Sequence, residues 1–208
     1  MSILYPAYFP NLAFFTVFAQ SDELVWETQG NYQKQTFRNR TYICNDRGKH
    51  ILSIPIAHVG SGKGKQLNRD VKIDNSYPWQ RQHWRTLETA YRTSPYFEFY
   101  EDDIKPLYDT EFEYLMDFNL KTIEIICDCL QRDMPASKTK IFKLDRENDY
   151  RGLVLVKNKF QLTQKDYNQV FGDRHGFTPN LSILDLLFNL GPNATAYLKE
   201  TKLKTGNA

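Results

Sequence analysis

The sequence predicts a single α/β domain in which a mixed, partly parallel sheet is flanked by helices. A strand, a helix and a second strand are expected within the first 27 residues, an order typical of a parallel unit. Residues 152–156 form a short apolar segment typical of an isolated buried strand. The length of 208 residues suits one domain, which we assign to residues 1–208. A linker-like break is expected near 133–140, and a frayed tail at 203–208.

The amino-terminal unit is predicted from three neighbouring segments. Residues 2–8 are apolar and aromatic and favour a strand that ends before Pro10. Asn11 can cap a helix that begins at Leu12 and is apolar on nearly all sides, as expected of a buried helix. Residues 22–27 give the second strand of the parallel unit.

A β-hairpin is expected next in the chain. Residues 41–43 and 51–57 alternate as strands do, and Asn45-Asp46-Arg47-Gly48 has the composition of a hairpin turn. The glycine- and lysine-rich segment 58–68 lacks the glycine spacing of a phosphate-binding P-loop, so we interpret it as a surface loop or a flap over an anionic ligand. Residues 71–73 are expected to form a short strand.

Helices dominate the rest of the chain. Pro78 in a first turn, with Ser76 as its cap, predicts one helix. Apolar residues at steps of three and four predict one long helix or two shorter ones over 104–130. A strongly apolar helix is expected to end at Leu190, and a last helical turn is expected at 195–202.

The composition excludes several classes of protein. The formal net charge of +2 is too balanced for general nucleic-acid binding. The amino terminus has no basic region, and Pro6 and Pro10 interrupt the apolar stretch, so we expect no signal peptide. No window approaches 18 apolar residues, so no membrane span is expected and the cytoplasm is the predicted location. The composition says nothing of the oligomeric state.

The cysteines and histidines give no pattern of a metal site. Cys127 and Cys129 are two residues apart on a predicted helix and point to different faces, which is typical of reduced thiols. The four histidines are widely spaced and match no zinc motif. No nucleophile elbow is present either. We therefore expect neither a metal nor a cofactor.

The aromatic and basic run from residue 74 to 101 is the first candidate site. Arg81 and Arg85 are four residues apart on one helix face and can hold a phosphate or carboxylate, with His83 as general acid–base. Alternatively, His83 is a half-buried structural residue and the arginines are solvated. The aromatic residues that can stack on sugar or base rings are Tyr8, Trp79, Trp84 and Tyr96.

Two further groups are candidates. Arg174 and His175 lie in a glycine-bounded loop before Asn180, where a helix amino terminus can bind an anion; the alternative is a polar turn. Arg38, Asn39 and Arg40 can grip phosphates, and the alternative is a charged turn.

Asp185 is also counted with the candidate catalytic residues, beside His83 and His175. It lies inside an apolar helix, where a carboxylate either caps a neighbouring group or faces a cavity.

The chain resembles the WbqC-like family of bacterial proteins. The stretches that carry the resemblance are Tyr5–Pro10 with Phe14-Phe15; Arg38–Arg40 through Asp74–Ser76 to His83–Arg85 and Tyr91–Phe97; and Phe177–Asn189 with Gly191-Pro192. Together they span nearly the whole chain, and residues 134–167 match least.

Two positions depart from the family pattern. Many members open with Gln-Pro where this chain has Tyr5-Pro6, and many carry an acidic pair where this chain has Glu27-Thr28-Gln29. Either Glu27 replaces that pair, or an activity that depends on the pair is lost.

The resemblance implies a transferase of surface-polysaccharide (O-antigen) synthesis, which moves a small acyl or aminoacyl group such as glycyl to an amino sugar on a nucleotide carrier. In that hypothesis His83 or His175 takes the proton of the attacking amine. A second hypothesis is a non-catalytic binding or scaffold protein for a glycan precursor or a protein partner. A third is a nucleotidyltransferase, although the first loop lacks the paired histidines usual in that class.

Overall fold

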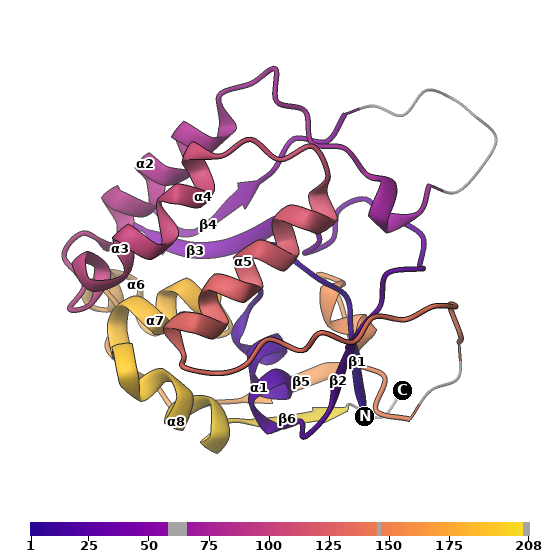
Figure 1. Cartoon of the computed structure of the whole chain (residues 1–208). Helices are drawn as coiled ribbons and strands as arrows, with labels where there is room; N and C mark the ends of the chain where they lie inside the picture. Colours follow the sequence, from indigo (N-terminus) through magenta and orange to yellow (C-terminus); the bar gives the residue numbers. More distant parts are fainter. Residues whose placement is uncertain (58–65, 145–146, 206–208) are drawn as a thin grey trace.

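A computed structural model describes residues 1–57, 66–144 and 147–205. Figure 1 shows a hairpin through the middle of the molecule, with helices α2, α3 and α4 along one side of it and α7 and α8 on another. Most of the predicted glycine- and lysine-rich loop, residues 58–65, falls outside the described residues. None of the helices in the described ranges is both long enough and apolar enough to cross a membrane.

The amino-terminal unit folds as predicted. Strand β1 (Ser2–Leu4), helix α1 (Leu12–Gln20) and strand β2 (Leu24–Trp26) follow one another, and β1 pairs with β2 in parallel. Asn11 caps α1, because its Oδ1 accepts a hydrogen bond of 3.1 Å from the backbone N–H of Phe14. Both strands are buried along their whole length.

The predicted hairpin is also present. Strand β3 (Arg40–Asn45) and strand β4 (Gly48–Ser53) pair antiparallel, and Asn45 lies opposite Gly48, so Asp46-Arg47 form the two-residue turn. Gly48 has a φ of +98°, a conformation that glycine adopts without strain. Strand β3 contacts α2 on one side and α7 on another, which places the hairpin inside the core.

The helices bury the aromatic residues of the sequence in one continuous core. The α-helices after the hairpin are α2 (Trp79–Tyr91), α3 (Phe97–Ile104), α4 (Pro106–Asp109), α5 (Leu115–Cys129), α6 (Gly172–His175), α7 (Ile183–Leu190) and α8 (Ala194–Glu200). The described residues also form three short 3-10 helices, η1 (Asn68–Asp70), η2 (Arg151–Val154) and η3 (Gly191–Asn193). The helix predicted to end at Leu190 is α7, which is buried as expected.

Several expected elements take another form. The strand expected at 152–156 is instead the 3-10 helix η2, because a short apolar run does not distinguish a strand from a buried helical turn. Ser76 does not cap α2; its Oγ lies 2.6 Å from Asp74 Oδ1. Residues 71–73 contribute isolated bridges, such as that between Ile73 and Ile56, and no strand.

Two longer segments also differ from the prediction. The helical region 104–130 divides at Pro106 and again before Leu115, so that it holds the end of α3, then α4 and α5. Residues 203–205 are not frayed: they belong to β6 (Lys202–Thr205), which pairs antiparallel with β5 (Phe160–Thr163). The pairing partner lies 40 residues away, which a local pattern does not reveal.

The α/β class and the parallel pair are confirmed. Within the described residues, however, the strands form three separate two-stranded sheets, β1-β2, β3-β4 and β5-β6, and not one mixed sheet. Strands as short as the three residues of β1 and β2 can form few hydrogen bonds with each other. The helices therefore supply most of the residues of the hydrophobic core.

Candidate functional site

Polar side chains gather where the parallel pair ends. Tyr5 follows β1 directly and Glu27 follows β2, and the N–H of Glu27 donates a 2.7 Å hydrogen bond to the Leu4 carbonyl. In open α/β structures, ligands bind outside the carboxyl ends of parallel strands. This edge is therefore the place where the fold favours a binding site.

Glu27 is a fully buried carboxylate with a complete set of partners. Its Oε2 lies 3.1 Å from Nη1 of Arg151, and its Oε1 accepts hydrogen bonds from Thr139 Oγ1 at 2.7 Å and from the N–H of Gln29 at 2.8 Å. Arg151 also pairs with Asp149 at 2.6 Å, and this hydrogen bond is the main reason that its pKa is raised. The pair therefore ties β2 to η2 with both charges compensated.

Arg38 lies beside this pair but has a different environment. Its side chain is 1% exposed, and its guanidinium carbon lies 4.1 Å from the centroid of the Tyr5 ring. Its Nη1 donates a 3.3 Å hydrogen bond to Thr36 Oγ1, and its side chain is also hydrogen-bonded to Tyr5. No carboxylate among the described residues pairs with it. Burial lowers the pKa of Arg38, because a guanidinium removed from water lacks a counter-charge there.

Buried polar atoms without a partner concentrate around Arg38. Among the described residues, the buried side-chain nitrogen and oxygen atoms that make no hydrogen bond are Arg38 Nε, Arg40 Nε, Asn39 Oδ1, Asn68 Oδ1 and Asn119 Oδ1. Buried polar groups are nearly always hydrogen-bonded, so these five atoms need an explanation.

Backbone contacts connect these side chains. Asn119 Nδ2 donates to the carbonyl of Arg38 at 2.7 Å, and the N–H of Asn68 donates to the carbonyl of Gly30 at 2.9 Å. Gly30 in turn lies against Tyr5: a Cβ at this position would stand 1.9 Å from the Tyr5 hydroxyl oxygen. Glycine is required here because the backbone passes directly beside the ring on which Arg38 stacks.

Tyr32 lies near enough to both arginines for their charges to act on its phenol. Burial raises the pKa of Tyr32, and the positive charges of Arg38 and Arg40 act in the opposite direction. We name this group the arginine cluster; its members are Tyr5, Tyr32, Arg38, Asn39, Arg40, Asn68 and Asn119. Guanidinium groups bind phosphates and carboxylates with paired hydrogen bonds, so the cluster has the chemistry of an anion site.

His83, a predicted catalytic residue, lies instead in the aromatic core. Its Nδ1 is 2.9 Å from the hydroxyl of Tyr8, which lies 2.8 Å from the hydroxyl of Tyr108. The ring also contacts Trp79 edge-on, with centroids 5.3 Å apart. Burial lowers the pKa of His83 to about 4, so the imidazole is neutral at pH 7.

Asp185 is likewise buried and fully partnered. Its carboxylate accepts hydrogen bonds from the hydroxyls of Tyr91 at 3.0 Å and Tyr167 at 2.6 Å, and from Gln169 Nε2 at 2.8 Å. Burial raises the pKa of Asp185, and the three donors oppose that shift. The carboxylate thus joins α7 to neighbouring segments. We name Tyr8, His83, Tyr108, Tyr91, Tyr167, Gln169 and Asp185 the buried polar core.

The other predicted residues are spread over the molecule. Arg81 and Arg85 are exposed on α2, whereas Trp79 and Trp84 of the same helix are buried. Tyr96 is half-buried and packs against Gly191, where a Cβ would approach its ring to 2.6 Å.

Arg174 and His175 are exposed, and both contact the carbonyl of Asp46 in the hairpin turn. Asn180 has a φ of +54°, and its Oδ1 accepts a 3.0 Å hydrogen bond from the N–H of Ala13.

Of the predicted residues, the structure therefore brings together Arg38, Asn39 and Arg40 in one group, and Tyr8, Trp79 and His83 in another. The sequence analysis did not single out Tyr32, Asn68, Asn119 or Arg151, because buried polar residues in unrelated segments form no local pattern. Tyr5 was marked in the sequence by its departure from the Gln-Pro of many family members, and the structure places it directly after β1.

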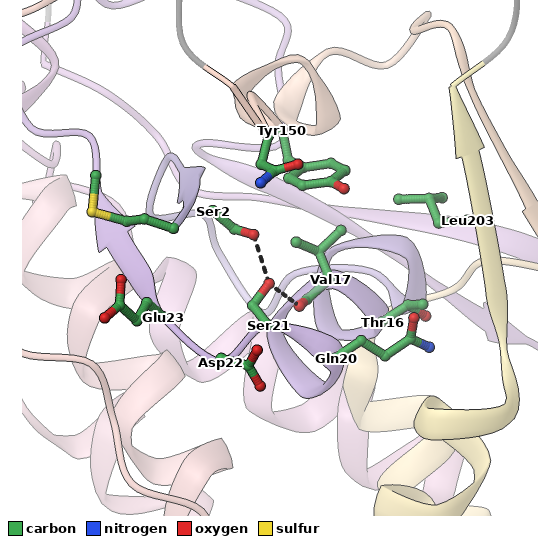
Figure 2. A pocket seen from close by; sticks show the side chains of 11 residues that line it. Ser2, Thr16, Val17, Gln20, Ser21, Asp22, Glu23, Tyr150 and Leu203 are labelled. Atoms are coloured by element: carbon green, nitrogen blue, oxygen red, sulfur yellow. Dashed lines mark hydrogen bonds between the residues drawn. The ribbon is translucent and has the colours of Figure 1, made fainter.

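A separate pocket of about 550 Å³ opens at the other end of β1 (Figure 2). Polar side chains from Ser2, Gln20, Ser21 and Glu23 line it, with Tyr150 opposite. Ser21 Oγ lies 2.7 Å from both the Ser2 hydroxyl and the Val17 carbonyl, so these small groups satisfy one another. No predicted site residue lines the pocket. Across the described ranges, no group of three or more histidine, cysteine or acidic side chains is placed to hold a metal ion.

Comparison with family models places this chain in one family. The model of the WbqC-like protein family matches residues 5–159 and 155–197. A protein of Mycobacterium tuberculosis, named "Uncharacterized protein Rv1507c", is 26% identical over 230 residues, which cover 96% of this chain and 97% of that protein. No solved structure matches this chain.

Proposed function

We propose, from the premise that this chain belongs to the WbqC-like protein family, that it is a cytoplasmic transferase of surface-polysaccharide (O-antigen) assembly. It would move a small acyl or aminoacyl group, such as glycyl, to the amino group of a nucleotide-linked amino sugar. The observation that carries the proposal is the arginine cluster at the carboxyl ends of β1 and β2, where buried guanidinium nitrogens have no hydrogen-bond partner among the described residues.

The arginine cluster would hold the diphosphate of the sugar carrier. A buried guanidinium without a counter-charge is costly in a free protein, and an anionic ligand removes that cost by supplying both charge and acceptors. Arg38 and Arg40 are two residues apart and the charges of both act on the pKa of Tyr32, so their two guanidinium groups would suit a ligand with two anionic centres. The Tyr5 ring already lies against the Arg38 guanidinium and against Gly30, so it positions Arg38 for the ligand.

The transfer needs an activated acyl donor as co-substrate, such as a thioester or an acyl phosphate. The sugar amine attacks the acyl carbonyl carbon, a C–N bond forms, and the C–S or C–O bond to the leaving group breaks. The amine must lose a proton, since an ammonium is not a nucleophile. His175 is the exposed candidate for this role, whereas His83 is enclosed by Tyr8 and Trp79.

The positions of the histidines favour a second candidate function, a non-catalytic binding protein for the same glycan precursor. His175 contacts the hairpin turn at Asp46, at the far end of β3 from Arg40. The five residue steps of strand between Arg40 and Asn45 span roughly 17 Å at about 3.3 Å per residue. A protein that binds the precursor without turnover needs no base beside the arginine cluster.

A thermal-shift titration tests the anion site. The probes are pyrophosphate, nucleoside diphosphates and nucleotide-linked amino sugars, measured on the unaltered protein and on Arg38→Met and Arg40→Met. A ligand at 100 times its Kd stabilises the native state by about 2.7 kcal/mol, which we expect to raise the melting temperature of the unaltered protein and not that of either variant. Arg47→Met is the matched control, because Arg47 is exposed in the hairpin turn, at the far end of β3 from Arg40.

A turnover assay then separates the two functions. Acylation of the bound amino sugar by a thioester or acyl phosphate donor would support the transferase. Binding that Arg38→Met abolishes, without acylation by any donor, would support the binding protein. A flat thermal response over the whole panel would contradict both.

A further inference from the structure

Exposed apolar side chains concentrate in one short part of the chain. Nine large hydrophobic residues are exposed in the described part of the molecule, and five of them lie between residues 141 and 156. Ile141 is 67% exposed and Leu144 is 78% exposed. The other three are Phe142, Leu155 and Val156. Scattered apolar residues are normal on a surface, but a group of this kind marks an interaction site.

Arg151 fixes the first half of this group, residues 141–144, to the body of the protein. The guanidinium carbon of Arg151 lies 4.7 Å from the centroid of the Phe142 ring, and its Nη2 donates a 3.1 Å hydrogen bond to the carbonyl of Leu144. The chain then turns through η2, where the N–H of Leu155 donates to the carbonyl of Gly152. Because Arg151 is itself held by Glu27, the exposed side chains are presented from an anchored base.

Exposed lysines lie next to these apolar residues in the sequence. Three lysines precede or alternate with the apolar residues at 141–144, namely Lys138, Lys140 and Lys143. Two more follow the apolar residues at 155–156, namely Lys157 and Lys159. All five lysines are exposed. Two acidic residues lie in the described part of the same stretch: Glu147 is exposed, and Asp149 pairs with Arg151. We name the five apolar residues with the five lysines the lysine-rimmed patch. Its charge is strongly positive although the whole chain carries only +2.

We propose that the lysine-rimmed patch docks on an anionic lipid bilayer. Apolar side chains that project from an anchored base can enter the boundary between headgroups and acyl chains, while neighbouring lysines extend their ammonium groups to anionic headgroups. Protein–protein interfaces are depleted of lysine at their core, whereas five lysines here alternate with or flank five apolar residues. Charge and apolar character together therefore fit a membrane surface better than a protein partner.

The docked orientation would place the arginine cluster near the lipid headgroups. Arg151 contacts the patch through Phe142 and the cluster region through Glu27, so one side chain joins the two. This inference does not rest on the proposed transfer reaction, because membrane attachment does not depend on which anion the cluster binds.

Vesicle co-sedimentation tests the proposal. The full chain is mixed with vesicles of phosphatidylcholine alone or of phosphatidylcholine with about one third phosphatidylglycerol, at low and at high salt. We expect binding to the anionic vesicles, with the bound fraction falling as salt rises because the lysine contribution is screened. The double variants Ile141→Ser/Leu144→Ser and Lys140→Glu/Lys143→Glu are each expected to lower the partition coefficient by about tenfold or more.

Two matched controls separate the patch from general surface properties. Phe99→Ser removes an apolar side chain that is 70% exposed on α3, and Lys105→Glu/Lys199→Glu reverses two exposed charges outside the patch. Both controls should bind as the unaltered protein does. Equal loss in the controls, or no binding to anionic vesicles at low salt, would overturn the proposal. Self-association that Ile141→Ser/Leu144→Ser abolishes, without vesicle binding, would show instead that the patch joins two copies of the chain.

Discussion

The arginine cluster and the buried polar core differ in how their polar atoms are satisfied. In the buried polar core, Asp185 accepts three hydrogen bonds from neighbouring side chains, and His83 and Tyr108 lie on either side of the Tyr8 hydroxyl. In the arginine cluster, Arg38 is equally buried, yet its Nε has no partner among the described residues. Both regions contain residues that the sequence marked as candidates for chemistry.

The difference in hydrogen bonding suggests a structural role for the buried polar core and a ligand-binding role for the arginine cluster. A polar group that the protein itself satisfies contributes to stability, and removing it leaves its partners unpaired. A buried charge without a partner costs stability in the free protein and is compensated when an anion binds. We therefore expect substitutions in the buried polar core to unfold the protein, and substitutions in the arginine cluster to change binding more than stability.

The largest effect is expected for Asp185→Ala. The substitution removes the acceptor of the Tyr91 and Tyr167 hydroxyls, whereas Gln169 Nε2 keeps the Thr178 carbonyl as an acceptor. Unsatisfied buried groups cost about 1–3 kcal/mol each, so the free energy of unfolding should fall by about 2 kcal/mol or more. Urea unfolding measures the change. Asp185→Asn is the control, because it keeps one oxygen acceptor and should lose less. Equal stability of Asp185→Ala and the unaltered protein would show that the three contacts are not structural.

The second prediction concerns acid sensitivity through His83. Its pKa is about 4 in the folded protein and about 6.5 in an unfolded chain, so between these values the unfolded state binds a proton that the folded state does not. Stability must therefore fall as the pH decreases from 6.5 to 4, by about 3 kcal/mol from this residue. Urea unfolding of the unaltered protein and of His83→Gln at both pH values measures the difference. An identical pH dependence of the two would contradict a buried, neutral His83.

The sequence predicted the elements that depend on neighbouring residues. Asn11 capping α1, the two-residue turn before Gly48 and the parallel order of β1 and β2 all follow from local patterns. The β5–β6 pairing was missed because its two strands are distant in the sequence, and η2 was missed because a short apolar run does not distinguish a strand from a buried helical turn. The site divides in the same way: Arg38, Asn39 and Arg40 were predicted from their spacing, whereas Asn68 and Asn119 reach the cluster only through the tertiary fold.

An intermediate effect is expected for Gly30→Ala. The new Cβ would stand 1.9 Å from the Tyr5 hydroxyl oxygen, so the ring that supports Arg38 must move. Overpacking of this kind costs about 1–3 kcal/mol, and the displaced Arg38 should weaken ligand binding in the thermal-shift titration. Gly172→Ala is the matched control, because no atom lies within 4 Å of its added Cβ. Normal binding by Gly30→Ala would place the ligand away from Tyr5.

The smallest effect on stability is expected for His175→Ala. His175 is exposed, and within the described residues its side chain makes one hydrogen-bond contact, to the Asp46 carbonyl, so the free energy of unfolding should change by less than about 0.5 kcal/mol. Because this contact lies at the hairpin turn, the ligand-induced shift at the arginine cluster should also be unchanged. Turnover is then the decisive measurement, with Arg174→Ala as the neighbouring control. If turnover is lost while stability and binding stay normal, His175 performs the chemistry although it lies outside both the arginine cluster and the buried polar core. The ligand must then extend along β3 toward the hairpin turn. If turnover also stays normal, the catalytic role predicted for His175 is wrong, and a transferase would need its base beside Arg38 and Arg40.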